Sequence, residues 1–325
     1  MKISLISTAK DAADHVEEFL GSLAAQTRPP DEVVIVDGGS TDGTADLLRA
    51  VDLVTLIEER GANIARGRNL AIAAAAHEVI AVTDSDCVLE PDWLAKLMVP
   101  LVEGADVAMG FYRPIVDGFW QECLASVNLP VDPVEVDPSR FMPSSRSVAF
   151  RREAIDAVGG YPEWLDIGED TWVDHRWREL GLDLRFAPDA VVGWRLRPSL
   201  GSSWMQYFRY ARGDAQGRMN PERHAVRLGA YLGLGLAATS RRRWPRALAA
   251  AAAVRYASTP VRRAWRRMPD TRERAIATVV VPALMGWIDT AKMAGYAAGL
   301  ADRSRIRMTQ GRGRSSRADE GPVQP

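Results

Sequence analysis

Two groups of acidic side chains follow buried apolar runs near the start of this 325-residue chain. Asp37 follows the run "VVIV" and precedes two glycines, whereas Asp84 and Asp86 follow the run "VIAV". Side chains two residues apart in an extended segment point the same way, so Asp84 and Asp86 can present two carboxylates to one face. No lysine or arginine adjoins them in the sequence. A divalent cation, Mg²⁺ or Mn²⁺, would neutralise such a pair and also bind a substrate's phosphates.

A third acidic group, Glu169 and Asp170, stands in "GEDTWVDHRW", directly before a helical pattern. A carboxylate here could act as a general base that deprotonates an acceptor hydroxyl. Each group also has a structural alternative. An aspartate before two glycines is common in turns, and acidic residues are common at helix starts. The residues alone leave both alternatives open.

The N-terminal half alternates strand and helix patterns, which predicts a sheet that positions these carboxylates. Apolar runs predict strands at 3–7, 32–37, 54–59, 78–84 and 106–111, with a return to the sheet at 184–194. Helical patterns lie at 16–23, 44–51 and 66–76 and twice within 152–181, and a proline-rich loop is expected at 128–145. This order indicates an α/β fold with a mostly parallel sheet, which binds ligands outside the carboxyl ends of its strands.

Charge divides the chain into two unlike halves. Residues 1–194 contain 16 Lys and Arg against 34 Asp and Glu, whereas residues 195–325 contain 25 against 8. From about Trp204 the sequence is helical, basic and apolar, and from 304 to 325 it is polar and expected to be disordered. Helices at an anionic membrane surface, a packed helical subdomain and one spanning helix are all compatible with residues 204–303, although Pro282, Asp289 and Lys292 interrupt the best spanning candidate.

Several other classes of protein are disfavoured. Two cysteines are too few for a disulfide framework, and "MKISLIS" is no secretory leader, so we expect the catalytic domain to be cytosolic. The phosphate-binding GxxxxGK[ST] and GxGxxG patterns, HExxH and GxSxG are missing. Nucleic-acid binding by the basic half is unlikely, because interleaved stacking aromatics are lacking.

The segments "EVVIVDGGSTDGTADLL", "RGRNLAI", "VIAVTDSDC" and "SVAFRREAIDAVGGYPEWLDIGEDTWVDHRWRELG" occur in this order. Together they resemble the family 2 glycosyltransferases of the GT-A fold, over about residues 3–195. The resemblance implies a Rossmann-like nucleotide-binding sheet flanked by helices. It also implies transfer of a sugar from a nucleotide-diphosphate donor, with inversion at the anomeric carbon. The expected catalytic domain is 1–203, divided into a donor region (1–112) and an acceptor region (113–203), and it is followed by the helical region 204–303 and the tail 304–325.

The resemblance also assigns roles in donor binding. Asp37 would hydrogen-bond the nucleobase, and Thr8 would lie beside the same nucleotide. Arg68, in "GRN", would lie near the nucleotide or its phosphates. Asp84 would help to bind the donor, and Asp86, with Asp84, would hold the Mn²⁺ or Mg²⁺ ion that bridges the diphosphate.

On the acceptor side, the resemblance makes Asp170 the general base, with Glu169 beside it. Gln206 and Arg209, in "QYFRYARG", would contact the acceptor, as in a loose version of the Gln-x-x-Arg-Trp motif, and an amphipathic helix with solvated arginines is the alternative for this stretch. Tyr210 stands where that motif has tryptophan, which argues against assuming processive synthesis.

Two further departures from the family pattern concern the donor side. Lys10 stands where the family often has asparagine. Trp194 stands where many members have a histidine that reaches the metal, so no third protein ligand is expected from this position.

The expected acceptor is a glycan or lipid-linked molecule of the cell envelope, met at the cytoplasmic face of the membrane. A transferase that acts on polyprenyl phosphate is one alternative, and a non-catalytic nucleotide-sugar-binding scaffold is another.

Overall fold

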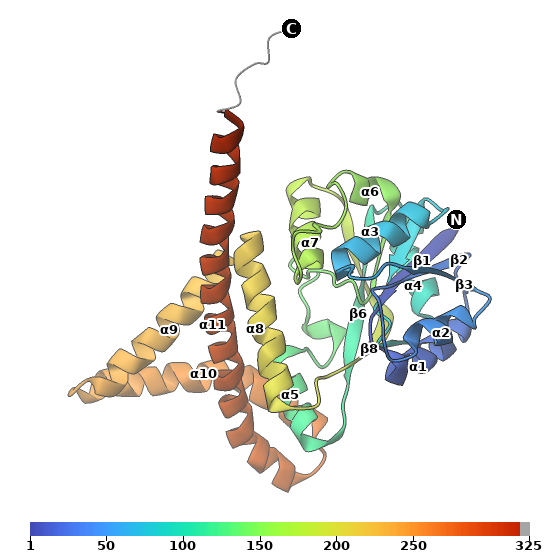
Figure 1. Ribbon diagram of the computed structural model, residues 1–325. Coiled ribbons are helices and arrows are strands. Elements are labelled where there is room, and N and C mark those ends of the chain that lie inside the picture. The colour runs from blue at the N-terminus through green and yellow to red at the C-terminus, as the bar shows by residue number, and fades with distance from the viewer. Residues whose placement is uncertain (319–325) are drawn as a thin grey trace. The chain divides into compact units, whose positions relative to one another are not determined.

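The computed structural model describes the backbone of residues 1–318 and the side chains of residues 1–303 (Figure 1). The chain forms two compact units. The first comprises Met1–Pro198 and Arg255–Met285, and the second comprises Ser199–Val254 and the chain from Gly286 onward. Of the tail expected to be disordered, 304–325, the backbone of residues 304–318 continues the last helix, and residues 319–325 lie outside the described residues.

An eight-stranded sheet of order β3-β2-β1-β4-β7-β6-β8-β5 forms the centre of the first unit. One half contains the strands β1 (Ile3–Ala9), β2 (Glu32–Asp37), β3 (Val54–Glu58) and β4 (Val79–Val82). These strands run parallel, as the apolar runs predict. In β4 every residue is buried, because helices cover both faces of this half of the sheet.

The other half of the sheet is mixed. Here β7 (Val148–Arg151) runs antiparallel to both β4 and β6 (Val107–Ile115). The long strand β8 (Leu184–Arg195) lies parallel to β6 and antiparallel to the three-residue β5 (Cys87–Leu89). The predicted α/β fold is therefore confirmed, and the parallel pairing is concentrated in the N-terminal half. Strands β5 and β7 were not predicted, since runs of three and four residues carry little periodicity.

Short helices connect the strands of the first unit. They are α1 (Ala13–Ala24), α2 (Thr44–Arg49), α3 (Ile64–Ala74), α4 (Trp93–Val102), α5 (Gly118–Asn128), α6 (Arg152–Asp156) and α7 (Glu169–Glu179). The expected loop at 128–145 contains only the 3-10 turn η1 (Pro133–Glu135). In Figure 1, α3, α6 and α7 lie on one side of the sheet, where Trp177 and Phe150 join a common buried core with Ile6 and Val82.

Some of the C-terminal sequence belongs to the first unit. Residues 255–285, from the end of α10 (Arg243–Arg267) and the start of α11 (Thr271–Ala318), pack against α5. Their buried cluster includes Cys123, Ala264, Met268 and Val281. Arg263 adds an ion pair of 2.8 Å with Glu135. This portion of the basic region is therefore anchored by apolar contacts, which charge alone did not reveal.

The second unit is helical and contains α8 (Leu200–Gly217), α9 (Pro221–Thr239) and segments of α10 and α11. Buried Asp289 accepts hydrogen bonds from Arg227 at 2.8 Å and from Tyr231 at 3.0 Å. Pro282, which interrupts the best spanning candidate in the sequence, lies inside α11, and the helix continues through it. Among the described residues one helix, Thr271–Arg303, is long and apolar enough to cross a membrane, by length and composition alone.

Candidate functional site

The strand register aligns the predicted donor residues along one edge of the sheet. In the β1–β2 pair, Ala9 lies opposite Asp37. In the β1–β4 pair, Ile6 lies opposite Val82, and the same register continued by two residues brings Thr8 opposite Asp84. Both acidic clusters therefore follow the carboxyl ends of β2 and β4, the two parallel strands that flank β1, and this end of an α/β sheet is where ligands bind.

Asp37 is buried and closes the turn that follows β2. One of its carboxylate oxygens accepts hydrogen bonds from the backbone N–H groups of Gly39 and Ser40, at 2.9 and 2.8 Å, and the other accepts one from the Ser40 hydroxyl. The structural alternative, a turn residue, is thus present in the molecule. The contact between Asp37 and a nucleobase stays a prediction. It would place the base against this turn.

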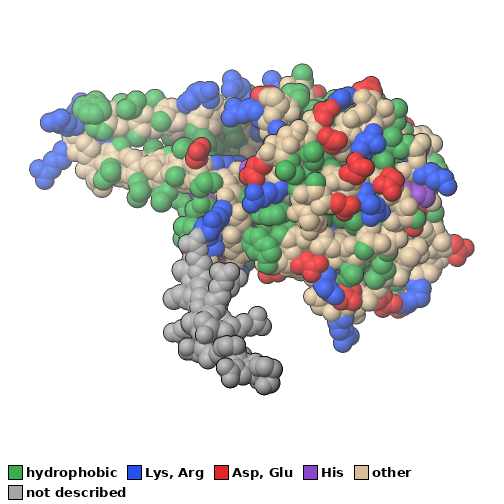
Figure 2. Space-filling model, turned by 90° about the horizontal axis from the view of Figure 1, so that it is seen from above, with side chains coloured by type: hydrophobic (Ala, Val, Ile, Leu, Met, Phe, Trp, Pro, Cys, Tyr) green, Lys and Arg blue, Asp and Glu red, His purple; other side chains and the backbone are tan. Residues whose placement is uncertain are grey.

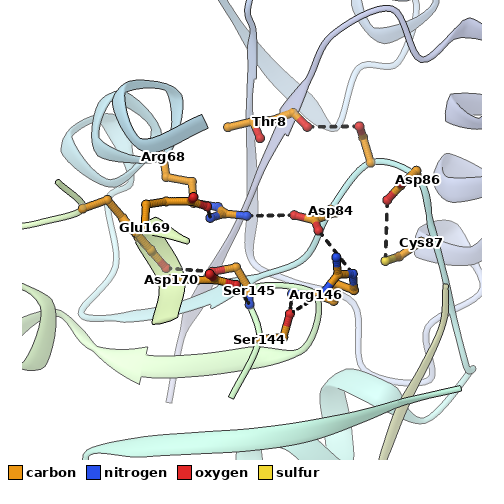
Figure 3. A network of polar contacts seen from close by, with 12 residues as sticks. Thr8, Arg68, Asp84, Asp86, Cys87, Ser144, Ser145, Arg146, Glu169 and Asp170 are labelled. Atoms are coloured by element: carbon orange, nitrogen blue, oxygen red, sulfur yellow. Dashed lines mark hydrogen bonds and ion pairs between the residues drawn. The ribbon is translucent and has the colours of Figure 1, made fainter. Parts of the chain in front are cut away.

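Arg68 connects the donor side of the site with the acceptor side. It lies in α3, and the preceding Gly67 lets this helix approach β1, since an added Cβ would lie 2.8 Å from Thr8 Cγ2. The Arg68 residue is 3% exposed. It donates to Asp84 at 2.9 Å and to Glu169 at 2.5 Å (Figure 3). Arg68 thereby joins Asp84 and Glu169, which are far apart in the sequence.

Burial and charge set the protonation of this bridge. Burial raises the pKa of Glu169 to about 7, although the Arg68 charge opposes this shift and the Asp170 charge adds to it. Burial also acts to lower the pKa of Arg68, but the Glu169 and Asp84 charges outweigh it and raise that pKa above its ordinary value. Arg68 is therefore a permanent cation, whereas Glu169 changes its protonation near neutral pH.

Asp84 has a second cationic neighbour that the sequence did not reveal. Arg146 Nε lies 3.8 Å from Asp84 Oδ2, and Arg146 also donates to Ser144 Oγ at 2.8 Å. No basic residue adjoins the Asp84–Asp86 pair in the sequence, but α3 and the segment before β7 bring Arg68 and Arg146 to Asp84.

Asp86 is half-buried, and the Cys87 thiol lies 3.9 Å from its Oδ1. Burial and the neighbouring Asp84 charge raise the pKa of Asp86, and the charges of Arg146 and Arg197 act in the opposite direction. A cation beside Asp86 would relieve both causes of this rise. Of the predicted metal ligands, Asp86 therefore fits the role better than Asp84, which already faces two arginines.

A complete protein cage for a metal is not present among the described side chains, which contain no group of three His, Cys, Asp or Glu that could hold an ion. Trp194, at the position where a histidine ligand was considered, is buried in β8 opposite Cys87. One or two carboxylates nevertheless suit Mg²⁺ or Mn²⁺, which commonly complete their shells with water and phosphate oxygens. The residues present thus fit a cation held jointly with a diphosphate.

Asp170 is the second residue of α7, after Glu169, and it faces the segment before β7. Its Oδ2 accepts from the Ser145 N–H at 3.5 Å, and its Oδ1 accepts from the Thr171 N–H at 2.7 Å. Through Ser145 and Arg146 it lies near Asp84 in Figure 3. The predicted base therefore shares a polar network with Arg68 and Asp84, whereas the hydrogen bonds of Asp37 stay within its own turn.

The predicted acceptor residues Gln206 and Arg209 belong to α8 in the second unit. Gln206 donates to Tyr210 at 3.0 Å, and the acceptor role of both residues stays a prediction.

Sequence reasoning missed two residues near Arg68. They are Ser145 and Tyr161, whose hydroxyl oxygens lie 3.3 Å apart. Tyr161 also lies 5.3 Å from the Arg68 guanidinium. Its place after two glycines was the only signal in the sequence.

Comparisons with known proteins agree with this geometry. The family model described as "Glycosyl transferase family 2" matches residues 4–159. Glycosyltransferase AglE of Haloferax volcanii is 26% identical over 66% of this chain and 73% of its own length. The O-antigen chain rhamnosyltransferase RfbN of Salmonella typhimurium is 23% identical over 59% of this chain and 66% of its own length.

A solved structure shares the fold. The mannosyltransferase PcManGT of Pyrobaculum calidifontis, in complex with GDP-Man and Mn²⁺, aligns with 93% of this chain and 86% of its own, at a TM-score of 0.55 and 21% identity. At this identity the likeness concerns the fold, and it confirms the GT-A architecture.

Proposed function

The chain carries a family 2 glycosyl transferase domain and is a glycosyltransferase, and on this premise we propose that it moves a sugar from a nucleotide-diphosphate donor to a hydroxyl of a cell-envelope glycan or lipid-linked acceptor. The observation that carries the proposal is the network in which Arg68 joins Asp84 to Glu169 beside Asp170. Groups suited to a diphosphate and a candidate base thus lie at the same end of the sheet. A relative named for O-antigen synthesis supports the class of acceptor.

The donor side follows from charge. In this proposal, Thr8 and Asp37 lie beside the nucleoside, and Arg68 supplies a buried positive charge near the phosphates. Asp86, together with Asp84, would hold a Mn²⁺ or Mg²⁺ ion, which supplies positive charge to the departing diphosphate when it is bound. The cation-bound neighbour structure supports this choice of cofactor.

The acceptor side follows from the different surroundings of two adjacent carboxylates. Glu169 is buried and committed to Arg68, so it is a poor partner for an incoming hydroxyl. Asp170 is partly exposed, and it accepts from the backbone N–H groups of Ser145 and Thr171. We assign Asp170 as the base that takes the acceptor proton while the hydroxyl attacks the anomeric carbon from the face opposite the diphosphate, which inverts that carbon.

Association with the cytoplasmic face of a membrane belongs to the proposal. In the second unit, Leu236 and Leu248 are 73% and 64% exposed, and arginines at 241–243 and 246 lie between them in the sequence. Figure 2 shows apolar and basic side chains side by side on the helical portion of the molecule. Exposed apolar groups beside arginines suit the headgroup region of an anionic membrane.

A donor screen tests the activity. The full chain is incubated with Mn²⁺ and a panel of UDP-, GDP- and dTDP-sugars, and release of the nucleoside diphosphate is measured. At least one donor is expected to be hydrolysed or transferred. A chain that binds a nucleotide sugar but never releases the diphosphate, with any acceptor extract, would indicate a scaffold.

A vesicle experiment tests the location. The full chain is expected to sediment with vesicles that contain phosphatidylglycerol and to remain in the supernatant with phosphatidylcholine alone. Equal recovery in the supernatant with both kinds of vesicle would remove the membrane association from the proposal and leave the activity intact.

A further inference from the structure

The turn that leads into β7 positions Arg146 in the site. The Ser147 N–H donates to the Ser144 carbonyl at 2.9 Å, and Arg146 lies within this turn, directly before the strand that pairs with β4. Arg146 Nε thereby lies 3.8 Å from Asp84 Oδ2, although the two residues are 62 positions apart in the sequence.

Two aromatic rings support the Arg146 guanidinium. Its central carbon lies 4.2 Å from the ring centre of Trp194 and 5.6 Å from that of Tyr112. The two rings meet edge to face at 6.2 Å. Trp194 is fixed in turn by its place opposite Cys87 in the β5–β8 pair, next to Asp86. A guanidinium stacked in this way keeps its plane, so less conformational entropy is lost when its edge binds a ligand.

The two arginines of the site, Arg68 and Arg146, differ in how far their side chains are exposed. Arg68 is enclosed between Asp84 and Glu169 and has a side chain that is 4% exposed. The Arg146 side chain is 17% exposed and lies 3.8 Å from Asp84. A planar guanidinium matches phosphate oxygens through paired N–H donors, and phosphate binding by arginine is strong because the hydrogen bonds are charge-assisted.

We propose that Arg146 binds the diphosphate of the donor, and that Trp194 is the positioning residue that holds the Arg146 guanidinium beside Asp84. This inference rests on the proposed function and adds a residue to it. In the transfer step, the bond from the anomeric carbon to the β-phosphate oxygen breaks, and its electron pair stays on that oxygen. The acceptor oxygen forms the new bond to carbon, and its proton passes to Asp170. Arg146 donates hydrogen bonds to the charge that develops on the diphosphate.

Calorimetric binding in EDTA separates this role from that of a metal. The probes are UDP, GDP and dTDP, each compared with its monophosphate, which lacks the β-phosphate. We expect wild type to bind one diphosphate more tightly than the matching monophosphate. Arg146→Gln is expected to weaken the diphosphate about 10- to 100-fold and to leave the monophosphate unchanged. Arg146→Lys keeps the charge but not the planar guanidinium, so its affinity for the diphosphate is expected to lie between those of wild type and Arg146→Gln.

Matched variants distinguish binding from folding. Arg113→Gln changes an arginine of β6 that is 52% exposed and paired with Glu90, and it is expected to leave both affinities unchanged. Trp194→Leu is expected to weaken only the diphosphate, about 3- to 10-fold, because the stacking contact is lost. Trp194→Phe keeps a ring and is expected to restore most of this loss, which a purely structural role of Trp194 would not predict.

The outcomes separate the inference from the function on which it rests. If wild type binds none of the diphosphates with or without Mn²⁺, the proposed function fails. The inference is overturned, and the proposed function stands, if wild type binds a diphosphate and Arg146→Gln lowers the affinity for the diphosphate and the monophosphate equally. The same holds if Arg146→Gln lowers neither affinity. Loss of the diphosphate preference in Arg146→Gln alone, with Arg113→Gln unchanged, supports the inference.

Discussion

The protonation of Glu169 predicts how stability depends on pH. Glu169 is 4% exposed, and its pKa in the folded protein is about 7, whereas an ordinary glutamate has a value of 4.5. Between these two values the folded chain keeps a proton that the unfolded chain has lost, so the free energy of unfolding falls as the pH rises. The stabilisation that protonated Glu169 contributes is present below pH 4.5 and is lost above about pH 7. The difference between the two pKa values corresponds to a decrease of about 3 kcal/mol in the free energy of unfolding.

The substitution Glu169→Gln removes this titration and keeps an oxygen that can accept from Arg68. Urea unfolding of wild type and variant, followed by circular dichroism from pH 5 to pH 8, measures the difference between their free energies of unfolding. Over this range the variant is expected to gain most of about 3 kcal/mol relative to wild type. Glu179→Gln, at the exposed end of the same helix, is the control and is expected to show no such trend. A difference between wild type and Glu169→Gln that stays constant over this pH range would refute the reasoning.

Three further outcomes test the site and the core. Asp170→Asn is expected to lower turnover about 100-fold or more and to leave donor binding measurable by calorimetry, and undiminished turnover would remove Asp170 as the base. Excess EDTA is expected to abolish transfer and added Mn²⁺ or Mg²⁺ to restore it, and full activity after exhaustive chelation would contradict the metal role. Gly110→Ala is expected to lower the free energy of unfolding by about 3 kcal/mol or more, because the added Cβ would lie 1.9 Å from Ser147 Oγ. Gly286→Ala, whose Cβ would meet nothing within 4 Å, is the control, and equal melting temperatures for both variants would contradict this packing argument.

The parallel half of the sheet was predictable from sequence because its signals are local. The runs that end at Asp37 and Asp84 are apolar, β-branched and bounded by turns, and parallel pairing then brings their ends to one edge. The charge balance of the site was not predictable in this way. Arg68 reaches Asp84 through helix packing and Arg146 reaches it from the turn before β7, and neither contact is indicated by the residues around Asp84.

Asp37 shows a different limit of sequence reasoning. Its position before two glycines is compatible with a turn and with a ligand contact, and the structure shows that its oxygens close the turn. Local hydrogen bonding of this kind can be predicted from the residues that follow Asp37. A contact with a particular nucleobase cannot, because it depends on groups of the bound donor.

The opposition of Asp84 and Arg146 has a consequence for how this chain could diversify. The turn Ser144–Ser147 sets the pair directly before β7, so loop residues 129–143 can change without moving it, provided that the turn keeps its place. A change in length within α5 would instead disturb the buried cluster that contains Cys123. Under the proposed function, variation in this loop would leave the contact between Arg146 and the diphosphate in place.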